Sequence, residues 1–233
     1  SGKRADPKRL LVNADIALYR AKSRGRNRHE FFTAALQAEI VSTKRMADEI
    51  LSGLERDEFI AHYQPQVDAR TFEIVGVEAL VRWQHPCRGL VAPGYFLKTA
   101  EELNVVATID RLILEQALAD FHGWAAMGLN VPRISVNVSA RRLQDSELIN
   151  GLRNLDIPRN ALSFELVESI FLDENDDLIT WNVNQIKELG IDVEIDDFGT
   201  GYASIVSLQK LKPRCTSSWS SGRWIRGTRS WSG

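Results

Sequence analysis

Apolar residues recur along this chain in two different rhythms, and the change of rhythm falls near Phe59. Before it the spacing is helical, over residues 14–22 and again over residues 33–57. After it, short apolar strands alternate with amphipathic helices. We expect strands near 60–66, 76–82, 133–138, 162–167 and 192–196, and helices near 94–103, 108–127, 145–153, 176–189 and 203–211.

This alternation predicts parallel strands joined by crossover helices, and hence an α/β fold. Periodicity alone leaves an open sheet and a closed barrel equally available. The chain carries no GxGxxG sequence and no P-loop after any of these strands, which weakens the case for a nucleotide-binding open sheet.

Composition and charge indicate which classes of function the chain is suited to. The apolar fraction is 44% and the charged fraction 26%, ordinary values for a globular protein. The net charge of −2 conceals a basic segment over residues 1–32 and an acidic body over 33–213. An acidic body argues against binding a nucleic-acid polymer. We recognise neither a membrane segment nor a signal peptide. The two cysteines form no disulfide framework, so we predict a cytoplasmic location.

Single polar residues interrupt four of the expected strands. Glu78, Asn137 and Glu165 lie within apolar runs, Asp196 ends the strand over 192–196, and Asp197 follows directly. A carboxylate buried without compensation costs several kcal/mol. Any one of these residues could be a satisfied polar group at a strand end. Together they favour convergence on a cation, and oxygen ligands suit Mg²⁺ or Mn²⁺.

Several segments also match known patterns. Residues 63–83 follow YQPxxD…GxEALxRW, joined in order by 93–96, 135–139, 165–169 and 196–202. This combination resembles the EAL domain, a family that hydrolyses the bacterial messenger cyclic di-GMP. Residues 14–28 resemble the closing ADxALYxAKxxGRN sequence of a GGDEF (diguanylate cyclase) domain, although the GGDEF loop itself is absent.

The resemblance implies a (β/α)8 TIM-like barrel whose first strand is antiparallel, here truncated after the fifth strand region. The expected organisation is a GGDEF remnant over 1–32, a connecting helix over 33–57, an incomplete EAL domain over 58–213 and an anomalous tail over 214–233. A homodimer through the EAL domain and an upstream GGDEF domain in the parent protein are also implied. The parent could be anchored in a membrane upstream.

The resemblance also assigns roles. It implies that a two-metal site of Mg²⁺ or Mn²⁺ is held by five residues: Glu78, Asn137, Glu165, Asp196 and Asp197. Gln64 and Arg82 would contact cyclic di-GMP, Arg82 through a phosphate. Glu168 would brace the loop over 197–201, so Glu78, Asp197 and Glu168 are the expected catalytic group. The product would be linear pGpG.

The resemblance stops at Pro213. The family continues with a strand that carries a lysine, a later strand with the general-base glutamate, and a closing strand. The last 20 residues instead hold six Ser, four Arg, three Gly and three Trp, without a strand or helix period. This change resembles a frame-shifted end. A genuine Arg- and Trp-rich tail that binds RNA or membrane is the weaker interpretation.

Two expectations follow for this chain. The sheet should have two open edges, and its inner apolar side chains should lack an opposing layer; we place there Val77, Leu80, Ile134, Val136, Phe164, Leu166, Val193 and Ile195. The chain alone should not hydrolyse cyclic di-GMP. The alternative function is a degenerate EAL module that binds cyclic di-GMP or a protein partner without catalysis.

Overall fold

The computed structural model describes residues 6–23, 25–68, 70–167, 170, 177–196, 215–220 and 223–227. The chain divides into two compact units, residues 1–52 and residues 53–233. Within the described residues no helix is both long and apolar enough to cross a membrane.

The first unit contains α1 (Pro7–Ser23) and most of α2 (Ala34–Glu55), which confirms both predicted helices and extends the first toward the N-terminus. Asp6 caps α1 by accepting a hydrogen bond from the Lys8 amide at 3.0 Å, and Pro7 occupies the first helical position. The ion pair between Arg20 and Glu39, 2.6 Å long, joins the two helices. Leu10, Leu11 and Leu18 of α1 are exposed.

The second unit contains the predicted strands and several elements that were not predicted. The predicted strands are β1 (Phe59–Asp68), β2 (Ile74–His85), β4 (Ile134–Asn137), β5 (Leu162–Val167) and β6 (Asp192–Asp196). The helices are α3 (Leu97–Glu102), α4 (Val106–Ala126), α5 (Ala140–Leu143), α6 (Leu148–Arg153) and α7 (Asp177–Glu188), with a 3-10 turn over Pro93–Tyr95. The hairpin strand β3 (Gly89–Val91) was missed, and the helix expected over 203–211 lies outside the described residues.

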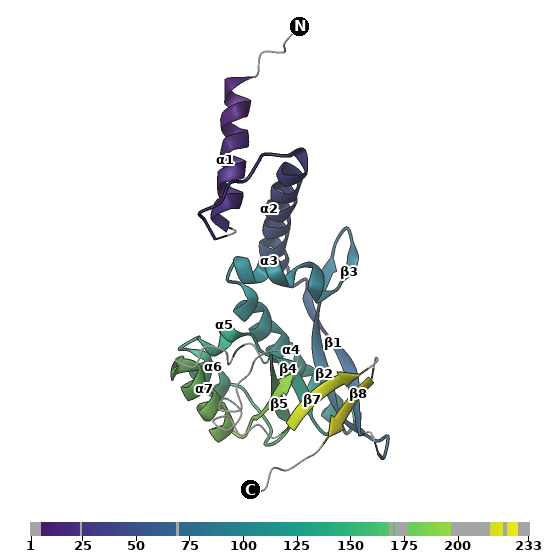
Figure 1. The fold of residues 1–233 in the computed structure, drawn as a ribbon. Coiled ribbons are helices and arrows are strands. Elements are labelled where there is room, and N and C mark those ends of the chain that lie inside the picture. Colours follow the sequence, from purple (N-terminus) through teal and green to yellow (C-terminus); the bar gives the residue numbers. More distant parts are fainter. Residues whose placement is uncertain are drawn as a thin grey trace. The chain divides into compact units, whose positions relative to one another are not determined.

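The tail corrects the sequence analysis. Its described residues form β7 (Cys215–Ser220) and β8 (Arg223–Gly227), where no strand was expected. β7 pairs in parallel with β6, β8 pairs antiparallel with β7, and β8 pairs in parallel with β1. The expectation of two open edges is therefore wrong, because the pairings of the described strands close into a ring. In Figure 1 the yellow strand β8 lies beside β1.

The rest of the ring agrees with the expected barrel type. β2, β4, β5, β6 and β7 are parallel in that order, and β1 runs antiparallel to β2 as predicted. β3 extends β2 beyond the ring. This is a mixed-sheet, TIM-barrel-like α/β fold.

The two faces of the strands are also not as expected. Side chains alternate between faces along a strand, and Glu78, Asn137 and Glu165 share the inner face. Seven of the eight apolar residues assigned to that face alternate with Glu78, Asn137, Glu165 or, on β6, with Glu194, the register partner of Glu165. They therefore lie on the outer face, and only Leu80 shares the side of Glu78. Helix α4 packs on β1, β2 and β4, and α7 packs on β6, so the helices supply the apolar layer.

Contacts on the outer face explain much of the YQPxxD…GxEALxRW pattern. Tyr63 packs edge-on against Trp124 of α4, with ring centroids 4.6 Å apart, and donates a hydrogen bond to Asp120. Trp83 is fully buried, stacks on Phe59 and donates to Glu58 at 2.9 Å. Phe59 and Trp83 are core residues, and Tyr63 is half-buried at the contact with α4.

Gly76 allows the close approach of β2 to the residue that precedes β4. The Val77 amide donates to the carbonyl of Arg133 at 2.9 Å. A Cβ atom at position 76 would lie 2.9 Å from that carbonyl oxygen and 3.2 Å from Gln66 Oε1. Backbone atoms cannot move aside as a flexible side chain can, so glycine is required by packing here.

We predict that Gly76→Ala lowers the free energy of unfolding by about 1–3 kcal/mol, the usual cost of overpacking. The matched control is Gly123→Ala in α4, where an added Cβ meets nothing within 4 Å. There alanine should stabilise the helix by about 0.5–1 kcal/mol. Urea denaturation of both variants measures the difference, and equal effects at the two positions would contradict the packing argument.

Candidate functional site

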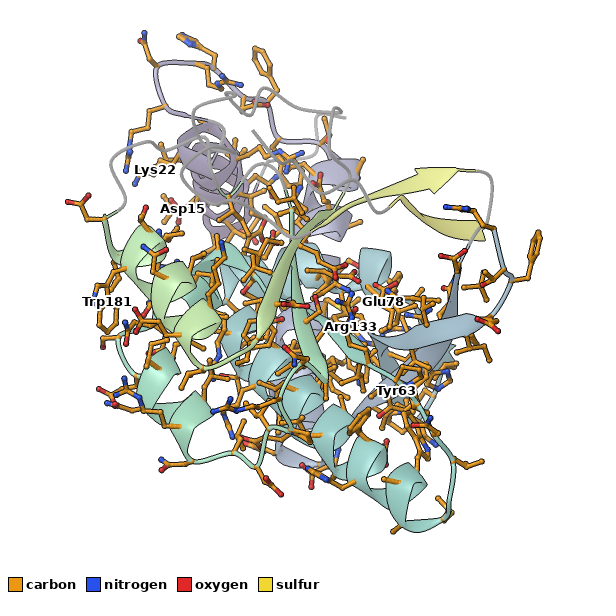
Figure 2. All side chains as sticks on the ribbon, turned by 90° about the horizontal axis from the view of Figure 1, so that it is seen from below. Asp15, Lys22, Tyr63, Glu78, Arg133 and Trp181 are labelled. Atoms are coloured by element: carbon orange, nitrogen blue, oxygen red, sulfur yellow. The ribbon has the colours of Figure 1, made fainter. Side chains whose placement is uncertain are left out.

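Glu78, Asn137 and Glu165 meet inside the ring, on three adjacent strands. Glu78 and Glu165 are 2% and 1% exposed. The Asn137 amide donates from Nδ2 to Glu78 Oε1 at 2.8 Å, and Asn137 is the register partner of Glu165 on the next strand. Figure 2 shows Glu78 toward the centre of the strands and Trp181 at the outer surface. The three side chains therefore lie on one face of adjacent strands, and their convergence on a cation stays a prediction.

Two further polar residues belong to the same interior. Gln66, which is 6% exposed, donates from Nε2 to Glu165 Oε1 at 3.0 Å. The hydroxyl of the fully buried Ser135 donates to Gln66 Oε1 at 3.4 Å. Sequence analysis missed both residues, although period-two alternation could have found them, because Gln66 follows Gln64 by two positions and Ser135 precedes Asn137 by two.

A third interior carboxylate is compensated by a cation of the protein itself. Arg133 precedes β4 and pairs with both Asp192 and Glu194 of β6. Burial raises the pKa of Glu194, and the neighbouring Arg133 charge opposes that shift. By contrast, the amides of Asn137 and Gln66 that bond Glu78 and Glu165 are neutral, so they orient these carboxylates without balancing their charge.

Glu78, Glu165 and Asn137 offer oxygen atoms that fit a metal ion. Because the Asn137 nitrogen faces Glu78, its side-chain oxygen is the atom suited to a cation. Two buried carboxylates and an amide oxygen are the oxygen donors that Mg²⁺ and Mn²⁺ accept. Within the described residues no cluster of three or more His, Cys, Asp or Glu side chains forms a complete metal site. The residues present nevertheless fit the chemistry of one.

The other predicted site residues are placed only in part. The backbone of Asp196 ends β6, where it is the register partner of Val167. Asp197 and Glu168 lie outside the described residues. Gln64 is half-buried opposite Glu78 in the β1–β2 pairing. Arg82 is half-buried on β2 and donates to the carbonyl of Val81 at 2.8 Å.

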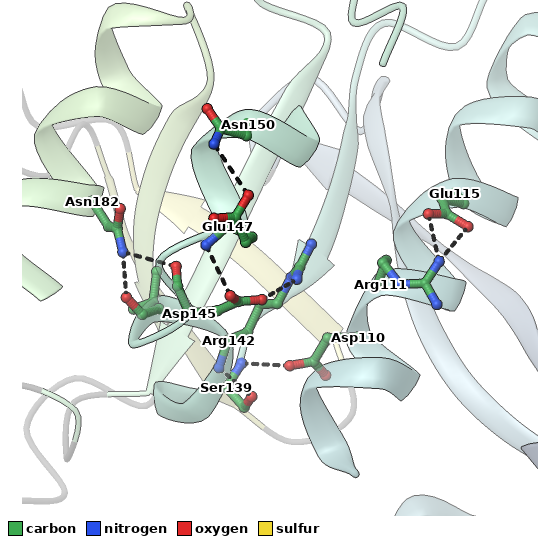
Figure 3. A network of polar contacts seen from close by, with 10 residues as sticks. Asp110, Arg111, Glu115, Ser139, Arg142, Asp145, Glu147, Asn150 and Asn182 are labelled. Atoms are coloured by element: carbon green, nitrogen blue, oxygen red, sulfur yellow. Dashed lines mark hydrogen bonds and ion pairs between the residues drawn. The ribbon is translucent and has the colours of Figure 1, made fainter. Parts of the chain in front are cut away.

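The segment after Asn137 is tied down by a polar network (Figure 3). Ser139 caps α5 by accepting from the Arg142 amide at 3.2 Å, while its own amide donates to Asp110 of α4 at 2.9 Å. Asn182 of α7 donates to the carbonyl of Leu143 at 2.7 Å. These bonds join α4, α5 and α7 beside the carboxyl end of β4. They fix the loop that leaves the candidate site.

Comparison with protein families gives a match to the EAL domain over residues 47–215. The chain is 34% identical over 206 residues to a protein of Pseudomonas aeruginosa named bifunctional diguanylate cyclase/cyclic di-GMP phosphodiesterase MucR, covering 87% of this chain and 30% of MucR. It is 34% identical over 211 residues to the cyclic di-GMP phosphodiesterase PdeR of Escherichia coli, covering 89% and 32%. The chain thus spans about a third of the length of these relatives.

Solved structures agree with the family match. The PaMucR phosphodiesterase in complex with c-di-GMP superposes with a TM-score of 0.68 at 32% identity, covering 74% of this chain and 71% of that one. The EAL enzyme Bd1971, bound to cAMP and cyclic di-GMP, gives a TM-score of 0.70 at 26% identity, covering 91% and 57%.

The pKa of Asp110 generates a test of the network beside the site. Burial raises this pKa to about 6, against the opposing effect of the Ser139 hydrogen bonds. The folded state therefore holds the proton more tightly than the unfolded state does. The stability contributed by protonated Asp110 is full below about pH 4 and is lost as the pH rises through 6.

We predict that Asp110→Asn becomes more stable relative to the wild type as the pH rises from 4 to 7, by up to about 3 kcal/mol. Asparagine keeps an acceptor for the Ser139 amide but has no charge to bury. Urea denaturation of both proteins at each pH measures the difference, and a constant difference across the range would contradict the raised pKa.

Proposed function

The chain belongs to the EAL domain family, and we propose that it is part of a phosphodiesterase that hydrolyses cyclic di-GMP to linear pGpG. The observation that carries this proposal is the meeting of Glu78, Asn137 and Glu165 in the barrel interior. Two relatives at 34% identity carry this activity in their names.

The roles of the residues follow from their chemistry and from the family. Glu78, Asn137, Glu165 and Asp196 would hold divalent cations, with Asp197 facing the second. Bound Mg²⁺ or Mn²⁺ would supply Lewis-acid stabilisation of the phosphodiester and an activated water. Gln64 would hydrogen-bond the dinucleotide, and the Arg82 guanidinium would pair with a phosphate. Glu168 would brace the loop that carries Asp197. One water is consumed for each P–O bond broken.

We also propose that residues 1–32 are the end of a GGDEF domain. On α1 the leucines Leu10, Leu11 and Leu18 are exposed, as expected of a helix whose apolar side belongs to a larger core. The relative MucR is named as both a cyclase and a phosphodiesterase. Homodimerisation through the EAL domain and a cytoplasmic location remain predictions.

Binding without hydrolysis is the second candidate. It is favoured by the composition of the tail. The family carries a lysine and a general-base glutamate on the strands that follow the position of Pro213, and residues 214–233 contain neither a lysine nor an acidic residue. The two candidates differ in a measurable way, since a binding module retains cyclic di-GMP unchanged.

Glu78→Ala in the full-length protein should lower cyclic di-GMP hydrolysis more than about 100-fold, because even the loss of an outer-shell partner of a metal costs 10–100-fold. Chromatography of pGpG formed with Mn²⁺ measures the rate. The matched control is Glu188→Ala at the exposed end of α7, which should keep the wild-type rate. A Glu78→Ala variant with full activity would refute the assignment.

The chain of 233 residues should bind cyclic di-GMP in the presence of Mn²⁺ but form no pGpG, because the lysine and general-base glutamate of the family are not among its residues. Equilibrium dialysis measures the binding, and chromatography of the same samples measures the product. Hydrolysis by this chain would show that its own residues complete the catalytic group. Retention of intact cyclic di-GMP by the full-length protein as well would favour the binding module.

A further inference from the structure

Gln66 is held in one orientation by partners of opposite hydrogen-bonding character. A carboxylate only accepts hydrogen bonds, so the NH₂ group of Gln66 must be the side that faces Glu165. The amide oxygen consequently faces Ser135, whose hydroxyl donates. The order Ser135 to Gln66 to Glu165 is thus set by chemistry, and it connects β4 to β5 through a residue of β1.

The surroundings of Gln66 leave little room for another arrangement. Its register partner across the β1–β2 pairing is Gly76. A Cβ atom there would lie 3.2 Å from Gln66 Oε1, so the amide rests close against the glycine backbone. Gln66 is 6% exposed, and a buried amide without these bonds would carry an uncompensated desolvation cost.

We propose that Gln66 is a positioning residue for the metal ligand Glu165, an inference that rests on the proposed metal-dependent function. Its Nε2 donates to Glu165 Oε1, so the bond fixes the orientation in which the carboxylate would meet the cation. Ser135 acts one step further out by keeping the amide from turning over. Outer partners of this kind set the orientation of a ligand and with it the affinity for the metal.

The test uses Mn²⁺ alone, so that it has a readout independent of catalysis. Gln66→Met keeps the length of the side chain and removes the amide. Isothermal titration of Mn²⁺ into the 233-residue chain should show binding weakened about 10–100-fold. The matched control is Gln116→Met. Gln116 of α4 bonds the backbone of β1 on the outer face, accepting from the Ala61 amide at 3.0 Å and donating to the Phe59 carbonyl at 2.8 Å.

Gln116→Met should lower the midpoint of thermal unfolding and leave the Mn²⁺ dissociation constant within about twofold of the wild type, because it lies outside the outer shell of the metal. If Gln66→Met also keeps wild-type affinity, the positioning role is wrong while the metal site stands. If the wild-type chain takes up no Mn²⁺, the proposed metal site fails, and the role of Gln66 fails with it.

Ser135→Ala decides the question if Gln66→Met does not fold. It removes only the hydroxyl that fixes the amide, so Mn²⁺ affinity should fall by about threefold or more with little change in the unfolding midpoint. Unchanged affinity in this variant would overturn the proposal.

Discussion

The burial of two carboxylates, Glu78 and Glu165, is the constraint on which the rest of the second unit depends. Both are almost inaccessible to solvent, and helix α4 packs on β2, the strand that carries Glu78. Removing such groups from water costs several kcal/mol each unless charge or hydrogen bonds compensate. Asn137 and Gln66 supply hydrogen bonds but no charge. These bonds orient both carboxyl groups inside the barrel, which fits the divalent-cation site proposed for them.

Because of this constraint, the two faces of each strand have different roles. The inner face carries the polar groups, so it contributes chemistry and little apolar burial. Stability must come from the outer face, where α4 and α7 cover the apolar residues of the strands. Each large side chain that is fully buried contributes about 1.5–3 kcal/mol. Residues such as Val136 and Ile134 of β4 therefore provide the driving force that allows Glu78 and Glu165 to be held inside. The fold can thus tolerate a costly interior because its apolar layer lies elsewhere.

Sequence analysis predicted the elements well where their periodicity was strong, and less well where pairing decided the structure. β4, β5 and β6 were recognised because each is a short apolar run, and helix α4 because its apolar spacing is long and regular. The strands of the tail were missed because residues 215–227 show no alternation, whereas backbone pairing with β6 and β1 is indifferent to side-chain pattern. The inner face was misassigned because apolar residues were taken to mark the interior. The even spacing of polar residues from Glu78 and Glu165 along their strands would have identified the inner face correctly.

Buried carboxyl groups on the inner face are bonded by two different kinds of side chain. Near the amino ends of the strands, Arg133 enters just before β4 and pairs with Asp192 and Glu194, so the compensating charge belongs to the protein. Glu165 is the register partner of Glu194, yet it is bonded by a neutral amide. A neutral amide orients the Glu165 carboxyl group without adding a charge beside it. Two register partners on β5 and β6 thus differ in the side chain that orients them, an amide for Glu165 and a guanidinium for Glu194.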